Sequence, residues 1–230
     1  MAGGALGDAP AVAAFDLDGT LTDGGSVVRW LSAVAGGGTT RRAIARRAVP
    51  LLSGAVRSGA AADRGKESLF VALLAGRAID DVEAVSASFA ESHLRRALRP
   101  EIVARLEAHL DRGHAVVVVS ASPSLYVSRI ASALGAHGSA ATDLAASDGT
   151  LTGRYEGANC RGEEKLRKVR ALLERLGAPR SDARPLYAYG NSRGDLRLLQ
   201  AADRPVDVSR LGRLGRLGRF PRLEGTALEP

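Results

Sequence analysis

The sequence predicts an α/β fold, a doubly wound and mostly parallel sheet with a small inserted helical cap. Three observations carry this prediction. The apolar runs AVAAF at 11–15 and AVVVVS at 115–120 indicate strands buried on both faces, as in a parallel sheet. Amphipathic stretches such as 162–176 alternate with the strands, as connecting helices do. Residues 24–98 contain no convincing strand, and their pattern is helical.

The elements are expected in a regular order after a flexible leader at 1–10. The inserted helices are predicted near 26–35, 40–53, 62–76 and 80–97. Pro50 is expected to end or kink the second of them. Ser122 is expected to cap a helix that begins at Pro123. The other predicted elements are a helix at 100–110, a short strand and a hairpin within 138–156, a helix at 162–176, strands at 186–190 and 205–209, and a helix at 192–202.

The composition bounds the class of protein. Of the 230 residues, 45% are hydrophobic, enough for one sizeable core and a small second lobe. The single cysteine, Cys160, excludes an internal disulfide and a cysteine-based zinc site, and it favours a reducing cytoplasm. No apolar stretch has the length of a membrane span, and the first ten residues lack the pattern of a secretory signal. The four histidines lack ligand spacing and are interpreted as structural.

The net charge of +7 is unevenly distributed. Residues 24–98 carry 11 basic and 6 acidic side chains, and residues 210–230 carry 5 and 2. Such basic segments attract phosphates or anionic lipid, and they are as often simply solvated surfaces. No nucleic-acid partner is expected. The repeat RLGRLGRLGRF at 210–220 has glycine at every third position, which disfavours a helix and indicates a flexible basic tail.

One inserted helix is a candidate for peripheral contact with an anionic membrane. The segment TTRRAIARRAV at 39–49 has four arginines and no acid. On a helical wheel Ile44 and Ala48 share one side. The other side carries Arg42, Arg46 and Arg47. The alternative is an ordinary helix packed by its apolar side, with the arginines in water.

The segment FDLDGTLT at 15–22 is the strongest chemical signal. It places Asp16 and Asp18 at the end of a strand, where two nearby carboxylates repel each other unless a cation or proton lies between them. Carboxylates suit Mg²⁺, and a carboxylate can attack phosphorus to form an aspartyl phosphate. Gly19 permits a sharp turn after Asp18. The alternative is an ordinary turn rich in Asp and Gly after a strand.

The motif DLDGT resembles the first signature motif of the haloacid dehalogenase superfamily. Three later segments resemble the other family motifs, in the family order: Ser120 after VVVV, Lys165 in GEEKL, and YGNSRGDLRLL at 189–199. The resemblance runs from Val12 to about Val208 and implies a Rossmann-like fold. Taken singly, Ser120 could be an ordinary strand-end serine and Lys165 a solvated helix lysine.

The resemblance implies a role for each matched residue. Asp16 is the expected nucleophile, and Asp18 the acid and then the base. Ser120 and Lys165 are expected to hold the phosphoryl group. Magnesium is expected on Asp16, the backbone carbonyl of Asp18, and Asn191, with Asp195 behind. The family most often has Asp where this chain has Asn191, so one negative charge is missing. Asp195 has a rival role as a helix cap with Ser192. Gly19, Ala121 and Arg161 are the expected substrate contacts; Arg161 could instead be a solvated loop residue.

The resemblance also implies a domain division and a reaction. The predicted catalytic core is 11–23 with 99–209, the cap is 24–98, and the tail is 210–230. The cap resembles that of phosphoserine phosphatase, whereas 148–166 resembles phosphatidylglycerophosphatase C-type enzymes. The predicted function is Mg²⁺-dependent hydrolysis of a phosphate monoester, either a phospholipid-type ester such as phosphatidylglycerophosphate or a soluble one such as phosphoserine. A catalytically weak phosphate-binding module is the third alternative, and the oligomeric state stays open.

Overall fold

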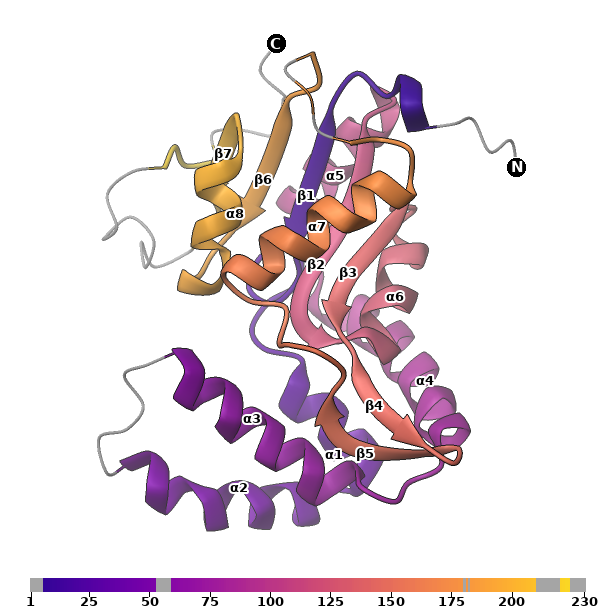
Figure 1. Ribbon diagram of the computed structural model, residues 1–230, viewed down its shortest axis with the longest axis vertical. Helices are drawn as coiled ribbons and strands as arrows, with labels where there is room; N and C mark the ends of the chain where they lie inside the picture. The colour runs from indigo at the N-terminus through magenta and orange to yellow at the C-terminus, as the bar shows by residue number, and fades with distance from the viewer. Residues whose placement is uncertain (1–5, 53–58, 180, 182, 210–219, 224–230) are drawn as a thin grey trace.

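The computed structural model describes residues 6–52, 59–179, 181, 183–209 and 220–223, with only the backbone described at 47–52. Its centre is a five-stranded sheet with the order β3-β2-β1-β6-β7, in which every neighbouring pair is parallel. The strands are β1 (Val12–Asp16), β2 (Ala115–Pro123), β3 (Gly138–Thr142), β6 (Leu186–Gly190) and β7 (Arg204–Asp207). Helices cover both faces of the sheet (Figure 1), so the predicted α/β fold class is confirmed.

Alternation along the buried strands creates a core on each face of the sheet. Ala13 and Phe15 of β1 enter one core, and Val12 and Ala14 enter the other. Helices α5 (Pro100–Asp111) and α6 (Ser124–Ala133) cover the first face. Helices α7 (Glu163–Arg175) and α8 (Leu196–Ala201) cover the second. All five residues of β1 are buried, which explains why its sequence is continuously apolar up to Asp16.

The chain reverses its direction of strand addition beside β1. It adds β2 and β3 on one side of β1, and then crosses over to add β6 and β7 on the other. In open parallel sheets, ligands bind beyond the carboxyl ends of the strands at such a reversal. The ends of β1 and β6 therefore define where a site is expected, and they carry Asp16 and Gly190.

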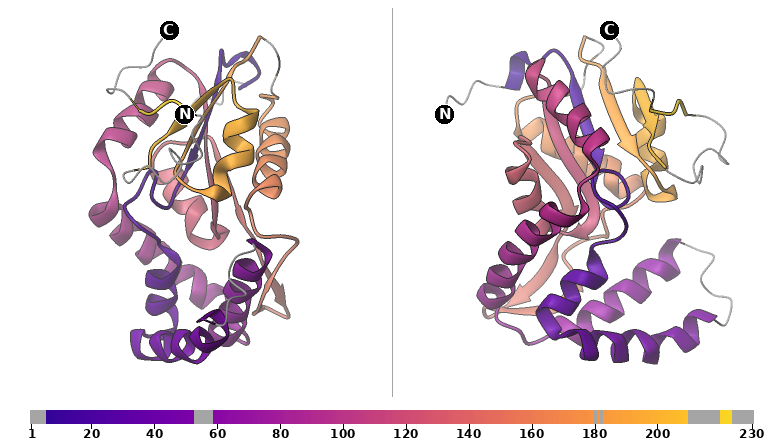
Figure 2. Two further views of the ribbon diagram at one scale, coloured as in Figure 1. Left: turned by 90° about the vertical axis from the view of Figure 1, so that its left-hand side faces the viewer. Right: turned by 180° about the vertical axis from the view of Figure 1, so that it is seen from behind.

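The inserted helices lie beyond the carboxyl ends of the strands (Figure 2). They are α1 (Val27–Ala35), α2 (Gly37–Leu52), α3 (Gly59–Leu74) and α4 (Ile79–Ala97). A hairpin of β4 (Leu144–Ser147) and β5 (Thr150–Tyr155) reaches down to them. It packs closely on α3, because a Cβ on Gly153 would lie 2.5 Å from the Cα of Val71. No helix in the described ranges is long and apolar enough to cross a membrane.

Several sequence-based boundaries need correction. Helix α2 continues through Pro50 to Leu52, so Pro50 does not end the helix. Ser122 does not cap a helix, because β2 extends to Pro123 and α6 begins at Ser124. The helix predicted at 192–202 divides into a 3-10 turn, η3 (Arg193–Asp195), and α8. A 3-10 turn, η1 (Leu6–Asp8), lies within the predicted flexible leader. The repeat at 210–219 lies outside the described residues.

A buried cluster of histidine and tyrosine connects α5 to the sheet. The Phe15 and Tyr189 rings stack with centroids 4.3 Å apart. The two ring nitrogens of His109 lie 2.7 Å from Nδ1 of His114 and 2.8 Å from the Tyr189 hydroxyl. Burial, together with the His114 charge, lowers the pKa of His109 to about 3. The cluster therefore stays neutral at ordinary pH.

Acid should destabilise the protein through this cluster. The pKa of His109 is lower in the folded chain than its ordinary 6.5, so the unfolded chain takes up this proton first as pH falls. The free energy of unfolding should then fall by up to about 1.4 kcal/mol per pH unit between roughly pH 6.5 and 3 from this group alone. His109→Gln should reduce that slope in urea unfolding series. An unchanged slope would place the acid sensitivity elsewhere.

Candidate active site

Asp16 is the last residue of β1, and its side chain is buried at the carboxyl end of the sheet. Its Oδ1 accepts a hydrogen bond from Nζ of Lys165 at 2.7 Å, and its Oδ2 accepts one from the Thr20 hydroxyl at 3.0 Å. Burial and the charge of Asp195 raise the pKa of Asp16 to about 7, although Lys165 opposes the shift. A further positive charge beside Asp16 would lower this pKa and keep the carboxylate ionised.

Lys165 lies between two carboxylates. It is only 2% exposed, in the first turn of α7, and its Nζ bonds Oδ1 of both Asp16 and Asp195. Burial disfavours the ammonium, but the two carboxylates raise the pKa of Lys165 far above its ordinary value. One buried cation between two buried anions leaves one negative charge in excess. A divalent cation would compensate that excess.

Asp195 also organises the loop after β6. Its Oδ2 accepts hydrogen bonds from the Ser192 backbone and hydroxyl and from the Asn191 backbone. The Ser192 side chain in return accepts from the Gly194 backbone, which completes a capping box on η3. Asp195 therefore performs the capping role that its sequence pattern indicates, and its other oxygen still faces Lys165.

Asn191 follows β6 and lies against the loop after β1. A Cβ on Gly19, whose φ is +83°, would lie 1.9 Å from Nδ2 of Asn191, so only glycine permits this approach. The carbonyl oxygen Oδ1 of Asn191 is buried and has no hydrogen-bond partner among the described residues. A buried amide oxygen without a donor is costly, and a cation would satisfy it.

Asp18 points toward the inserted helices and β2. Its Oδ1 accepts from the backbone N–H of Ser26, at 2.7 Å, and its Oδ2 accepts from the Ser122 hydroxyl at 2.5 Å. Ser26 precedes α1, and its hydroxyl lies 2.7 Å from that of Tyr126 on α6. The carboxylate of Asp18 is thus fixed by the first residues of the insert as well as by the core.

Ser120 and Ala121 lie where β2 departs from regular pairing. Val119 pairs with Asp16, so Ser120 lies one residue beyond the level of the Asp16 carboxylate. The register between β2 and β3 shifts between Val119 and Pro123. Within this irregular segment the Ser122 backbone N–H donates to Oγ of Ser120 at 3.0 Å. The hydroxyl proton of Ser120 is therefore available to another acceptor.

Comparison with known proteins agrees with this geometry. A family model described as haloacid dehalogenase-like hydrolase matches residues 13–200. The chain belongs to this family. A protein named CicA from Caulobacter vibrioides is 34% identical over 87% of this chain and 86% of its own length. Phosphoserine phosphatase SerB1 from Mycobacterium tuberculosis is 28% identical over 88% of this chain and 66% of its own.

Solved structures show the same fold. A Bordetella pertussis protein of unknown function has a TM-score of 0.78 and 26% identity, covering 94% of this chain and 99% of that chain. A phospho-aspartyl intermediate analogue of phosphoserine phosphatase has a TM-score of 0.59 and 18% identity, covering 87% of each. The predicted family and the predicted class of enzyme, a phosphatase, are confirmed at this level.

The haloacid dehalogenase-like site has a second set of contacts, between α3 and the core. Nζ of Lys66 donates to the Ala121 carbonyl at 2.5 Å and to Oδ1 of Asn159 at 2.9 Å. Asp63 accepts from Nδ2 of Asn159 at 2.7 Å and forms an ion pair with Arg161 at 3.6 Å. Arg161, expected to contact substrate, is thus directed toward α3 in this structure.

Sequence reasoning missed Lys66, Ser122 and Ser26 as members of this site. A signal for Lys66 exists, because the chain has only three lysines beside 29 arginines. The family motif directs attention to Lys165 alone. The third, Lys168, bonds the Ala141 carbonyl and Asp143 away from Asp16. No comparable signal marks Ser122 or Ser26, whose hydroxyls acquire meaning only through contacts about a hundred residues apart in sequence.

The residues around Asp16 suit a metal ion although their donors are not a cluster of acidic side chains. No group of three or more His, Cys, Asp or Glu side chains in the described part of the chain could hold a metal. The Asp16 carboxylate, the Asp18 backbone carbonyl and the Asn191 amide oxygen would instead supply oxygen donors of the kind that Mg²⁺ prefers. The unsatisfied Oδ1 of Asn191 and the excess negative charge at Lys165 both fit such an ion.

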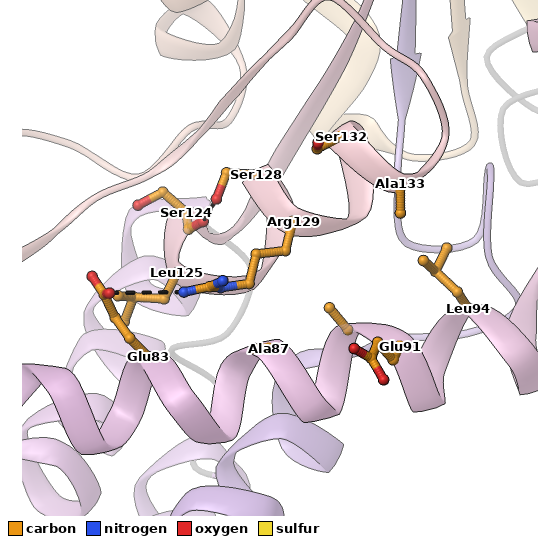
Figure 3. A pocket seen from close by; sticks show the side chains of 11 residues that line it. Glu83, Ala87, Glu91, Leu94, Ser124, Leu125, Ser128, Arg129, Ser132 and Ala133 are labelled. Atoms are coloured by element: carbon orange, nitrogen blue, oxygen red, sulfur yellow. Dashed lines mark hydrogen bonds and ion pairs between the residues drawn. The ribbon is translucent and has the colours of Figure 1, made fainter.

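A groove elsewhere on the molecule is separate from this site. It has a volume of about 640 Å³ and lies between α4 and α6 (Figure 3). Glu83 and Arg129 face each other across it at 3.7 Å. None of the predicted site residues lines it.

Proposed function

We propose that this protein hydrolyses a small, soluble phosphate monoester through an aspartyl-phosphate intermediate. The observation that carries the proposal is the buried Asp16, placed at the end of β1 beside Lys165 and level with the irregular end of β2. The relative named phosphoserine phosphatase supports an ester of that kind. We keep the division into a core of 11–23 and 99–209 and a cap of 24–98 as part of the proposal.

In the first half-reaction, a carboxylate oxygen of Asp16 attacks phosphorus and the bond to the leaving oxygen breaks. Asp18 donates its proton to that oxygen, so it must begin the step protonated. Ser26 and Ser122 hold the Asp18 carboxyl by one backbone N–H and one hydroxyl, which fixes its direction. Ser120 and Lys165 donate hydrogen bonds to the phosphoryl oxygens.

In the second half-reaction, the now ionised Asp18 takes a proton from water. The water oxygen attacks the phosphorus of the aspartyl phosphate, releasing inorganic phosphate and the carboxylate of Asp16. We assign Asp16, the backbone carbonyl of Asp18, and Asn191 as the ligands of Mg²⁺. Asp195 would lie behind these ligands, near the ion. When bound, the ion supplies positive charge that offsets the phosphate and the carboxylates. We assign Gly19 and Ala121 to substrate binding, where their backbone would approach the substrate closely.

A lipid phosphomonoester is the second candidate substrate. The observation in its favour is that Arg41, Arg42 and Arg46 of α2 are exposed, while Ala43 and not Ile44 is the more buried residue of that turn. Arg47 and Ala48 lie outside the described side chains. Exposed arginines also occur on helices that never meet a membrane, so we place this substrate second.

Substrate class should be decided by turnover. We expect phosphate release from phosphoserine-like soluble esters to exceed release from lipid phosphomonoesters in mixed vesicles. The variant with both Arg42→Gln and Arg46→Gln should leave both rates unchanged within about twofold. If lipid turnover is the faster and falls in the double variant, more so at low salt, the lipid substrate and a peripheral membrane location replace the soluble one.

Nucleophilic catalysis should depend on Asp16 and on metal. Asp16→Asn should abolish release of phosphate from an aryl phosphate, because the amide cannot form the acyl phosphate, and chelation of Mg²⁺ should do the same. Asp111→Asn, an exposed residue at the end of α5, serves as the matched control and should keep full activity. Phosphate release that persists both in Asp16→Asn and after chelation of Mg²⁺ would reject the mechanism. A wild-type protein that binds phosphate but turns over no monoester would favour the weak binding module.

Asn191 should set the affinity for magnesium. Asn191→Asp should tighten Mg²⁺ binding, because a charge is added at the ion, and Asn191→Leu should weaken it severely. Isothermal titration with Mg²⁺ measures both without requiring turnover.

The neighbouring glycine gives an independent check of the same assignment. Gly19→Ala must displace the Asn191 amide and should weaken Mg²⁺ binding. Gly24→Ala is the control, because Gly24 also has a positive φ, of +69°, but a Cβ there meets nothing within 4 Å. Both variants should lose about 1 kcal/mol of stability from backbone strain, and only the first should lose metal affinity. If both variants bind Mg²⁺ with equal affinity, the assignment of Asn191 as a ligand of the ion is wrong.

A further inference from the structure

Lys66 makes an unusual set of contacts for a half-buried lysine. Its ammonium bonds two neutral oxygens, the carbonyl of Ala121 and the side chain of Asn159. It lies 5.7 Å and 5.9 Å from the ring centroids of Phe70 and Tyr155. The nearby Asp63 pairs with Arg161 instead, and no ion pair of Lys66 occurs among the described residues. Burial lowers the pKa of Lys66 to about 8, although Asp63 and Asp18 oppose the shift.

The carbonyl that Lys66 binds belongs to the peptide unit joining Ala121 and Ser122. The N–H of that same unit donates to Oγ of Ser120. A cation on the carbonyl oxygen polarises the peptide and strengthens its N–H as a donor. Because Oγ of Ser120 then accepts from the peptide, its own proton is directed elsewhere.

We propose that Lys66 is a positioning residue that acts through the Ala121–Ser122 peptide to orient the Ser120 hydroxyl toward the phosphoryl group. The contact crosses from α3 to the end of β2, so docking of α3 and completion of the phosphate-binding segment become one event. The inference rests on the proposed function, because it gives Ser120 the role of a phosphate donor. Two other roles for Lys66 make different predictions: a tie that only holds α3 in place, and a direct contact with the leaving group.

A double-mutant cycle between Lys66 and Ser120 separates these roles. Lys66→Met removes the charge and the donor but keeps an unbranched side chain that is only one heavy atom shorter. It should lower kcat/KM for an aryl phosphate, and raise the Ki of inorganic phosphate, by about tenfold to a hundredfold, the usual effect of losing a charge-assisted hydrogen bond. In a Ser120→Ala background the same change should cost less than about twofold. Lys66→Arg should recover part of the loss. Arg64→Met, exposed on the same helix, is the control and should have no effect.

Two results would overturn the inference. Equal losses with and without Ser120 would show that Lys66 acts independently of that hydroxyl. An unchanged Ki for inorganic phosphate, with KM altered only for esters, would place Lys66 on the leaving group. If Lys66→Met does not fold, the cycle is measured with Lys66→Gln. If the wild-type protein turns over no monoester, the proposed function fails on its own, and the cycle is still measured from calorimetric binding of inorganic phosphate.

Discussion

The buried ammonium of Lys165 between Asp16 and Asp195 is the interaction on which the site depends. A lysine that is 2% exposed is tolerated only because two carboxylates meet it, and each carboxylate would be costly without it. The three residues come from β1, α7 and the loop after β6, so the contact requires the crossover that returns the chain to the other side of β1. The contact among the three charged residues thus depends on the strand order of the sheet.

Local interactions hold Asp195 and the loops around the Lys165 contact in place. The capping box after β6 fixes Asp195 and the backbone of Asn191. Gly19 allows the loop after β1 to approach Asn191 so closely that a methyl group would collide with its amide. Arg99, which precedes α5, donates to the carbonyls of Gly19 and Val208 and so joins the loop after β1 to the end of β7. None of these interactions adds a positive charge that contacts Asp16 or Asp195. The excess negative charge around Lys165 therefore stays uncompensated by the described protein groups.

How much the sequence predicts depends on whether a contact is encoded locally. Four successive valines predict β2 because burial on both faces demands them, and the S-x-x-D pattern predicts the cap at Ser192 because its partners are three residues apart. The order of the family motifs groups Asp16, Lys165 and Asp195 from the sequence alone. Ser122, by contrast, has the pattern of a helix cap but bonds Asp18 from 104 residues away. Lys66 likewise meets Ala121 only through the packing of α3 on the hairpin of β4 and β5, which no local pattern encodes.

The insert between the first two motifs contacts several of the residues to which we assign roles in the proposed reaction. At its start, the Ser26 backbone fixes Asp18, and in its third helix Lys66 meets the peptide beside Ser120. Asp63, one turn from Lys66, bonds Asn159 in the loop that precedes α7, and α7 carries Lys165. Asp18, the end of β2 and the loop that precedes α7 therefore all have contacts to the insert.

The two halves of α3 are held in different ways. Its first half meets the core through the polar contacts of Asp63 and Lys66, whereas Phe70, Leu73 and Leu74 of its second half are buried in the hydrophobic core. The position of its first half therefore depends on polar contacts with the core, whereas its second half is held by the burial of apolar side chains.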